Sequence, residues 1–319
     1  MNDPDTTATV LSESSRRAPG GRTLLIVSSD ASDLWVANQV ARRLPLAGIV
    51  VEHQRAPRDA RPRWEKLVSL LPEPRQLANR TREALERPLH RIWMDRILQE
   101  RPTEFGVEAT GLQPHVACPV HRVEAPERLN DDRCSRWIGE RAPDLLLVCG
   151  AGLLGPAILE IAPLGALNLH SGLSQFYRGL FTTEWAILDG MPERIGGTVH
   201  LVSRGIDDGG VLYQFRPELV AGDHPNRSYE KVMRVGVEAL VQAAEDVLGS
   251  VSRPQLPATL GRLCRRTEFN ARQKRRLWRR WRSTMTAYAR ERESRDAEID
   301  AILIHPYGNR PSTSPRERC

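Results

Sequence analysis

Three polar side chains in the middle of the chain, Asn168, His170 and Asp207, are of types that can stabilise or move charge during a reaction. An amide N–H and a protonated imidazole can each donate a hydrogen bond to an oxygen on which negative charge develops. A nearby carboxylate favours the charged form of an imidazole and can accept a proton. Alone, each has a simpler explanation, because an Asn-x-His pair often only ends a strand and an Asp often only caps a turn. Whether these three side chains act in a reaction therefore depends on whether the fold brings them together.

A short strand is predicted to carry Asn168 and His170. Residues 164–169 are mostly apolar, and side chains two residues apart on a strand point to the same face. Both polar side chains would therefore lie together at the end of this strand, before a loop that contains Gly172.

Asp207 follows a second predicted strand, at 197–202. The loop 205–210 holds it between this strand and a third strand at 211–215. His200 alternates with apolar neighbours in the second strand, and we expect it to be a structural side chain on the sheet face.

The order of these elements resembles the formyltransferase family that uses 10-formyltetrahydrofolate. Any one motif would be a weak signal, but their joint order over about 45 residues is specific. The resemblance covers roughly residues 21 to 250. The matching motifs are Asn168-x-His170, Tyr177-Arg178-Gly179, Trp185 in a short helix, Gly197-Thr198, and Ile206-Asp207-Asp208-Gly209.

The resemblance implies a catalytic role for the three polar side chains. An acceptor amine attacks the formyl carbon, and negative charge develops on the carbonyl oxygen of a tetrahedral intermediate. Asn168 and His170 would donate to that oxygen. Asp207 would favour protonated His170 and could accept the proton that leaves the amine. The formyl donor would be 10-formyltetrahydrofolate, and neither a metal nor a covalent enzyme intermediate is required.

The resemblance also implies two binding regions. Ligands in open α/β sheets bind beyond the carboxyl ends of the strands, and in this family the loop after the strand at 144–149 lines the pterin pocket, largely through its backbone. Tyr177, Arg178 and Gly179 would hold the acceptor, although Arg178 could equally form a structural ion pair. The residues expected to bind the folate are Cys149, Gly150, Ala151, Gly152, Leu153 and Leu154, with Ile206 and Asp208 from the second loop.

The loop after His170 departs from the pattern of methionyl-tRNA formyltransferases. They usually have Ser-Leu-Leu-Pro-x before Tyr-Arg-Gly, whereas this chain has Gln175 at the proline position. Its form is more similar to bacterial members that act on small metabolites or sugars. We therefore expect the acceptor to be a small-molecule primary amine, such as an amino sugar, an amino acid or a peptide-like compound. The alternatives are activity on an aminoacyl-tRNA and a non-catalytic folate- or nucleotide-binding module.

An α/β fold with a Rossmann-like, mostly parallel sheet is predicted. The near-continuous apolar run 23–28 is typical of a buried parallel strand, and it is followed by a helical pattern to about Leu44 and a second strand at 46–52. This βαβ unit indicates a parallel sheet. The turn after the first strand lacks GxGxxG, so no dinucleotide fingerprint is present. Another strand is expected at 115–120.

Composition limits the class of protein and the cellular compartment that we expect. The 319 residues are 40% apolar and 27% charged, and no apolar run approaches the roughly 20 residues that cross a bilayer. The first twenty residues contain no apolar signal segment, and the five cysteines show no metal-ligand spacing, so a reduced, cytoplasmic protein is expected. A net charge of +6 permits an anionic partner without identifying one.

Four segments are predicted along the chain. Residues 1–21 form a disordered tail, and 22–250 form the catalytic domain with a helical insertion at about 54–108, which is either a lid or a packed decoration. Residues 251–319 form a basic helical extension and a polar tail. From Arg262 to Arg295 there are thirteen Arg or Lys against three Glu, with apolar residues at helical spacing. A solvated basic face is the expected explanation, and a nucleic-acid partner is the less favoured one.

Overall fold

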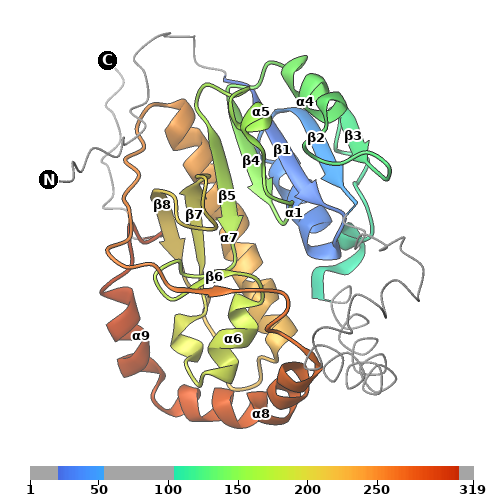
Figure 1. Cartoon of the computed structure of the whole chain (residues 1–319). Coiled ribbons are helices and arrows are strands. Elements are labelled where there is room, and N and C mark those ends of the chain that lie inside the picture. The colour runs from blue at the N-terminus through green and yellow to red at the C-terminus, as the bar shows by residue number, and fades with distance from the viewer. Residues whose placement is uncertain (1–20, 54–103, 309–319) are drawn as a thin grey trace, which may run out of the picture.

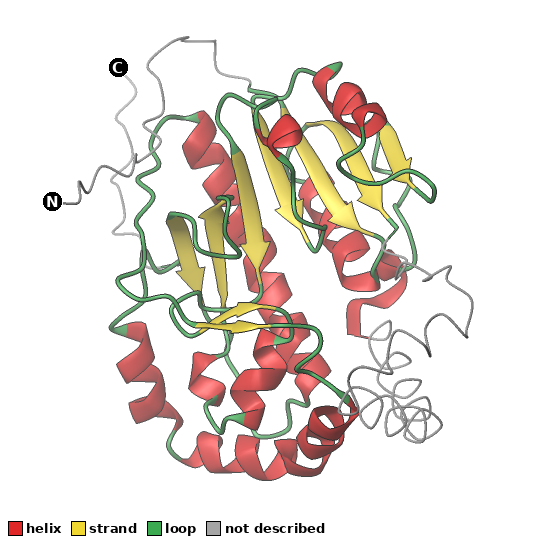
Figure 2. Ribbon diagram, viewed as in Figure 1, coloured by secondary structure: helices red, strands yellow, loops and turns green. Residues whose placement is uncertain are grey.

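The computed structural model describes residues 21–53 and 104–308 of the chain. A seven-stranded sheet in the order β3-β2-β1-β4-β5-β7-β8 forms its centre (Figures 1 and 2). Neighbouring strands from β3 to β5 are parallel, and β7 and β8 are antiparallel to their neighbours. The predicted α/β class is therefore confirmed. The strands are β1 (Thr23–Ser28), β2 (Leu46–Glu52), β3 (Val120–Val123), β4 (Leu145–Cys149), β5 (Ala166–His170), β7 (Gly197–Leu201) and β8 (Val211–Phe215).

Helices cover both faces of the sheet (Figure 2). The α-helices are α1 (Ala31–Ala41), α4 (Asp132–Gly139), α5 (Pro156–Leu159), α6 (Thr182–Leu188), α7 (Pro225–Leu248), α8 (Ala271–Arg290) and α9 (Arg292–Asp300). Two short 3-10 helices are η1 (Gly106–Ala109) and η2 (Pro192–Arg194).

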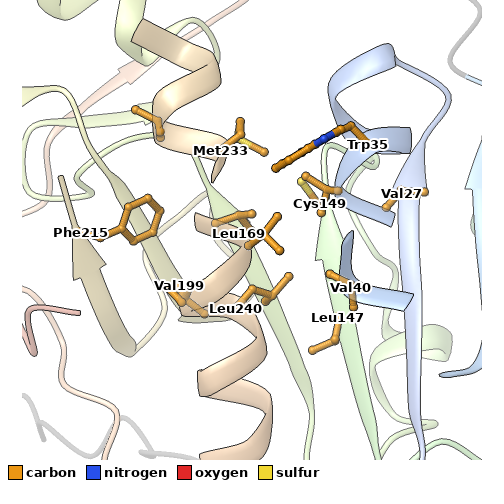
Figure 3. Close-up of a cluster of buried hydrophobic side chains, with 14 of the residues drawn as sticks. Val27, Trp35, Val40, Leu147, Cys149, Leu169, Val199, Phe215, Met233 and Leu240 are labelled. Carbon is orange, nitrogen blue, oxygen red and sulfur yellow. The ribbon is translucent and has the colours of Figure 1, made fainter. Parts of the chain in front are cut away.

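Alternation along β1 divides the core into two clusters. Leu25 and Val27 point toward α1 and α7, where a large cluster includes Leu240 (Figure 3). Leu24 and Ile26 point to the opposite face, against α4 and α5. Because both faces are covered, every residue of β1 is buried, which accounts for its unbroken apolar run. Burying each such side chain contributes roughly 1.5–3 kcal/mol to folding.

The C-terminal extension returns to the middle of the chain. A two-stranded parallel sheet pairs β6 (Tyr177–Gly179) with β9 (Arg262–Cys264). The next helix, α8, packs its apolar stripe against α6, beyond β6 at the same end of the molecule (Figure 1). The extension is therefore built onto β6 and α6.

Some boundaries differ from the sequence expectations. The strand expected at 115–120 is instead β3, which begins at Val120, because the residues before it form a turn. The extension contains β9, and it continues as helix α9 where a polar tail was expected. Residues 1–20 and 54–103, which include the predicted tail and almost all of the predicted insertion, lie outside the described residues. None of the described helices is both long and apolar enough to span a membrane.

Candidate active site

The carboxylate of Asp207 joins four groups at one end of the sheet. Its Oδ2 lies 3.3 Å from Nδ1 of His170 and accepts a 2.8 Å hydrogen bond from the backbone N–H of Gly179. Its Oδ1 accepts from Nδ2 of Asn168 at 3.3 Å and lies 3.4 Å from Nε2 of His200. The three predicted catalytic side chains thus converge on one point, together with a fourth that was not predicted.

Strand pairing explains this convergence. Asn168 on β5 lies opposite His200 on β7, and His170 lies opposite Thr198. Because alternate residues on a strand share a face, these side chains point to the same side of the sheet. Asp207 reaches them from the loop between β7 and β8, with its backbone in the left-handed region at a φ of 50°. Asp adopts this region more readily than most residues other than glycine, which suits this position.

Gly172 lets the loop after β5 approach the imidazole of His170. A Cβ at this position would lie 2.6 Å from Nε2 of His170, 2.8 Å from the carbonyl oxygen of Tyr177 and 2.9 Å from a side-chain carbon of Thr182. These separations are too short for a side chain. The glycine is therefore required where the loop crosses the imidazole of His170.

His170 has an acceptor at each ring nitrogen. Its Nε2 lies 3.1 Å from the carbonyl oxygen of Tyr177, which can only accept, so this nitrogen carries a proton. Its Nδ1 faces the Asp207 carboxylate. A proton on each ring nitrogen would satisfy both contacts. With the ring 5% exposed and both nitrogens engaged, its stabilisation of an oxyanion would act through charge, or after the contact with Tyr177 breaks.

The environment holds Asp207 in its ionised form. Burial alone would raise the pKa of this carboxyl, but the charge of His170, the hydrogen bond and charge of His200 and the N–H of Gly179 outweigh it. The net effect lowers the pKa well below its usual range. A carboxylate held so acidic is a weak base. The contacts of Asp207 therefore suit electrostatic support of His170 better than proton abstraction.

The sequence did not predict the contact made by His200. This residue is 3% exposed; its Nδ1 lies 2.8 Å from the carbonyl oxygen of Leu201, and its Nε2 lies 3.2 Å from Nδ2 of Asn168. It was expected to be only a structural residue on the sheet face, yet it touches two of the predicted catalytic side chains. One feature of the sequence could have indicated this contact. Thr198 and His200 are two residues apart on the strand that precedes the loop with Asp207, so their side chains share one face of the sheet.

Comparison with known proteins identifies the family. A family model described as "Formyl transferase" matches residues 94–244, the segment that contains β3 to β8, most of α7, and the side chains of Asn168, His170, His200 and Asp207. This match assigns residues 94–244 of the chain to the formyltransferase family.

Curated relatives of this family member share part of its length. A "Methionyl-tRNA formyltransferase" of Anaeromyxobacter dehalogenans (strain 2CP-1 / ATCC BAA-258) is 34% identical over 143 residues, covering 43% of this chain and 46% of the relative. One from Chlorobium chlorochromatii (strain CaD3) is 26% identical over 156 residues, covering 48% of each chain. The chain thus spans about half the length of these curated relatives.

Solved structures of similar arrangement include two formyl-transferring proteins. A sugar N-formyltransferase from Shewanella sp. FDAARGOS_354 is 16% identical with a TM-score of 0.47, covering 81% of this chain and 87% of the other. Glycinamide ribonucleotide transformylase 1 from Symbiobacterium toebii is 18% identical with a TM-score of 0.48, covering 77% and 99%.

In this family member, the residues expected to hold the acceptor make contacts inside the protein. Nε of Arg178 donates to the carbonyl oxygen of Gly261 at 3.0 Å, and its Nη1 donates to that of Ile206 at 3.2 Å. The hydroxyl of Tyr177 donates to Asp189, while Gly179 supplies its N–H to Asp207. Arg178 thus braces two backbone carbonyls and also lies 4.0 Å from the carboxylate of Asp208, while its role toward the acceptor stays a prediction.

The start of the C-terminal extension forms part of this arrangement. Besides the β6–β9 pairing, three backbone hydrogen bonds of 2.9–3.0 Å tie the extension to the loop. A Cβ on Gly261 would lie 2.2 Å from the carbonyl carbon of Phe176, so only glycine fits there. The three bonds are Gly261 N–H to Ser174, Arg262 N–H to Phe176, and Leu180 N–H to Cys264.

The predicted folate loop begins where β4 ends, beside β5. Val148 pairs with Asn168, so the residues from Cys149 onward start next to β5. Leu153 is 71% exposed, whereas Cys149 is buried, and burial together with Asp33 raises the pKa of its thiol. Such a thiol is unreactive at neutral pH.

Backbone groups in this loop already have partners inside the protein. The N–H of Gly152 donates to Glu52 at 2.7 Å, and the carbonyl of Leu153 accepts from Asn130. In the second loop, the hydroxyl of Ser203 donates to the carboxylate of Asp208.

Among the described residues, no group of three or more His, Cys, Asp and Glu side chains is arranged to hold a metal ion.

Proposed function

We propose that the protein transfers a formyl group from 10-formyltetrahydrofolate to a primary amine. The observation that carries this proposal is the convergence of Asn168, His170 and Asp207 within 3.3 Å contacts at the end of β5. This arrangement supports acyl-type transfer, because it supplies a neutral donor and a cation on one side of the sheet.

The reaction exchanges one carbon–nitrogen bond for another. The acceptor nitrogen bonds to the formyl carbon, the bond from that carbon to N10 of the folate breaks, and one proton passes in net from the amine to N10. The side-chain amide of Asn168 would donate to the oxygen that becomes negative, and the positive charge of His170 would lower the energy of the same intermediate. Asp207 would keep His170 charged and oriented throughout.

The donor would occupy the space beyond the ends of β4 and β5. The loop 149–154 suits a flat ring held by its backbone, because it has no charged side chain and exposes the apolar surface of Leu153. We propose that this loop and residues 206–208 hold the folate. The N–H of Gly152 would contribute only on release from Glu52.

The acceptor we propose is a small-molecule amine, on the basis of the loop that carries Gln175. A second candidate is an amine carried on RNA, supported by the names of the curated relatives and by the basic helix α8. The four described cysteines are free thiols, which supports a cytoplasmic site of action.

The direct test is incubation of the purified chain with 10-formyltetrahydrofolate and a panel of amines that includes amino sugars, amino acids and aminoacyl-tRNA. Release of tetrahydrofolate together with a mass gain of one formyl group on one acceptor supports the proposal and names the acceptor class. Saturable binding of 5-formyltetrahydrofolate with no transfer to any amine in the panel supports the non-catalytic binding module instead. Absence of folate binding at millimolar ligand would contradict both.

A further inference from the structure

Helix α8 presents an exposed face made of arginine. Its apolar residues Leu277, Trp281, Met285 and Tyr288 are buried on one side. Its twenty residues include no Asp or Glu. We call its exposed arginines the basic face: Arg272, Arg276, Arg279, Arg280, Arg282 and Arg290.

These arginines form no ion pair with any described residue, unlike the cations of the other long helix. On α7 each of the three cations is paired: Arg227 with Glu230 at 2.7 Å, Lys231 with Asp223 at 2.7 Å, and Arg234 with Glu230. The basic face therefore concentrates positive charge that the described part of the chain leaves uncompensated. Such a field attracts polyanions over distances of about 10 Å at 0.1 M ionic strength.

The chemistry of the basic face distinguishes among three classes of partner: a protein, a membrane and a nucleic acid. None of the large exposed apolar side chains of the described residues lies on α8, whereas the centre of a protein–protein interface is apolar and depleted in charge. A helix that lies in a membrane surface needs its apolar stripe free to insert, and the stripe of α8 is already buried in the protein. A phosphate backbone requires only regularly spaced cations, and the guanidinium group is well suited to phosphate.

We propose that the basic face of α8 binds the phosphate backbone of a nucleic acid, in particular RNA. All six arginines lie after residue 244, where the match to the family model ends, so this surface is separate from the matched domain. The helix follows β9, which pairs with β6 beside Asp207, and it packs against α6. A bound strand would therefore lie at the end of the molecule that holds β6 and α6 (Figure 1), and Gly179 of β6 donates to the carboxylate of Asp207.

The experiment measures binding of the full chain to a fluorescently labelled RNA hairpin by anisotropy over a range of salt concentrations. One variant replaces Arg272, Arg276 and Arg279 with Gln, which keeps length and helix propensity. Its matched control replaces Arg122, Arg133 and Arg136 with Gln, exposed cations at the β3–α4 edge, so both proteins lose the same net charge. We expect the α8 variant to lose affinity about ten-fold or more and its salt slope to fall by roughly one for each phosphate contact removed.

Several outcomes would overturn the proposal. Equal losses in both triple variants would mean that binding follows net charge alone. Absence of RNA binding by the unmodified chain at low salt would contradict it directly, as would binding to anionic phosphatidylserine vesicles but not to RNA. Thermal melting of each variant confirms that the fold is retained. Because no folate or amine is present, the result is independent of whether the proposed formyl transfer is correct.

Discussion

Two regions of the molecule depend on charge, but in opposite ways. One is the Asp207 cluster, which consists of Asn168, His170, His200 and Asp207, and the other is the basic face of α8. Each oxygen of Asp207 and each ring nitrogen of His170 and His200 has a partner within the protein. The six arginines of the basic face are exposed and have no ionic partner among the described residues. In the first region one buried network fixes a few charges in place. In the second region many similar charges act from the surface. Substitution of one residue of the cluster should therefore lower turnover severely, and losses from two such substitutions should not add in free energy. Substitution of one arginine of the basic face should weaken RNA binding slightly, and such losses should add in free energy.

The largest effect is expected in the cluster. His170→Ala and Asp207→Asn should each lower turnover by about 100-fold or more, because one removes the cation and the other removes the charge that maintains it. Affinity for 5-formyltetrahydrofolate should change far less, since these interactions strengthen as charge develops. The double variant should lose much less than the product of the two single losses. Near-normal turnover by His170→Ala on the true acceptor would show that the mechanism is wrong.

A pH effect should accompany Asp207→Asn. Because the folded protein lowers the pKa of Asp207, its ionised form contributes stability above the unfolded-state pKa of about 4, and this contribution is lost as pH falls further. The unmodified chain should therefore lose stability more steeply than Asp207→Asn below about pH 4. Chemical denaturation at a series of pH values measures this difference. Parallel curves would indicate that Asp207 is not ionised in the folded state.

An intermediate effect is expected where the extension meets the site. Gly261→Ala places a Cβ 2.2 Å from the backbone of Phe176 and should separate β9 from β6, displacing Gly179 and Arg178. We expect kcat to fall about ten-fold, the scale of a positioning defect, with a smaller change in folate affinity. Gly222→Ala is the matched control, because a Cβ there meets nothing within 4 Å. Equal activity of the two variants would mean that β9 does not position the catalytic loop.

Smaller effects are expected on the basic face. Arg276→Gln alone should weaken RNA binding only a few-fold at moderate salt and leave small-molecule turnover unchanged. Adding Arg279→Gln should lower the RNA affinity to about the product of the two single losses. In the Asp207 cluster, by contrast, the double variant should lose less turnover than this product. Anisotropy titrations of the single and double variants measure this. A complete loss of binding from one substitution would instead indicate a single specific contact.

The smallest effect is expected for Asp208→Asn, next to the catalytic carboxylate. Asp208 accepts from the hydroxyl of Ser203 and lies 4.0 Å from Arg178, so the amide can keep the first contact. Turnover should stay within about two-fold, because the substitution keeps the backbone of residues 206–208, through which we expect this loop to hold the folate, and a surface change of this kind alters stability little. Loss of turnover in Asp208→Asn but not in Asp207→Asn would show that the catalytic carboxylate was assigned to the wrong residue.

Local patterns predicted the parts of the molecule in which neighbouring residues decide the structure. The apolar runs of β1 and β4 identified buried parallel strands, and the i, i+2 spacing placed Asn168 and His170 on one face. Contacts set by strand register were missed, because the pairing of His200 with Asn168 depends on how β5 and β7 align. The three residues of β9 are too few to show alternation, and their partner β6 is more than 80 residues away.

The pairing of β9 with β6 also limits how this protein can be recombined. An exchange of C-terminal segments between family members would have to join the chains after Cys264, since a junction at the end of α7 would remove the residues that hold β6. The natural unit of exchange in this chain is therefore longer than the segment that the family model matches, and a chimera joined at residue 244 would inherit Asn168, His170 and Asp207 without the strand that braces β6.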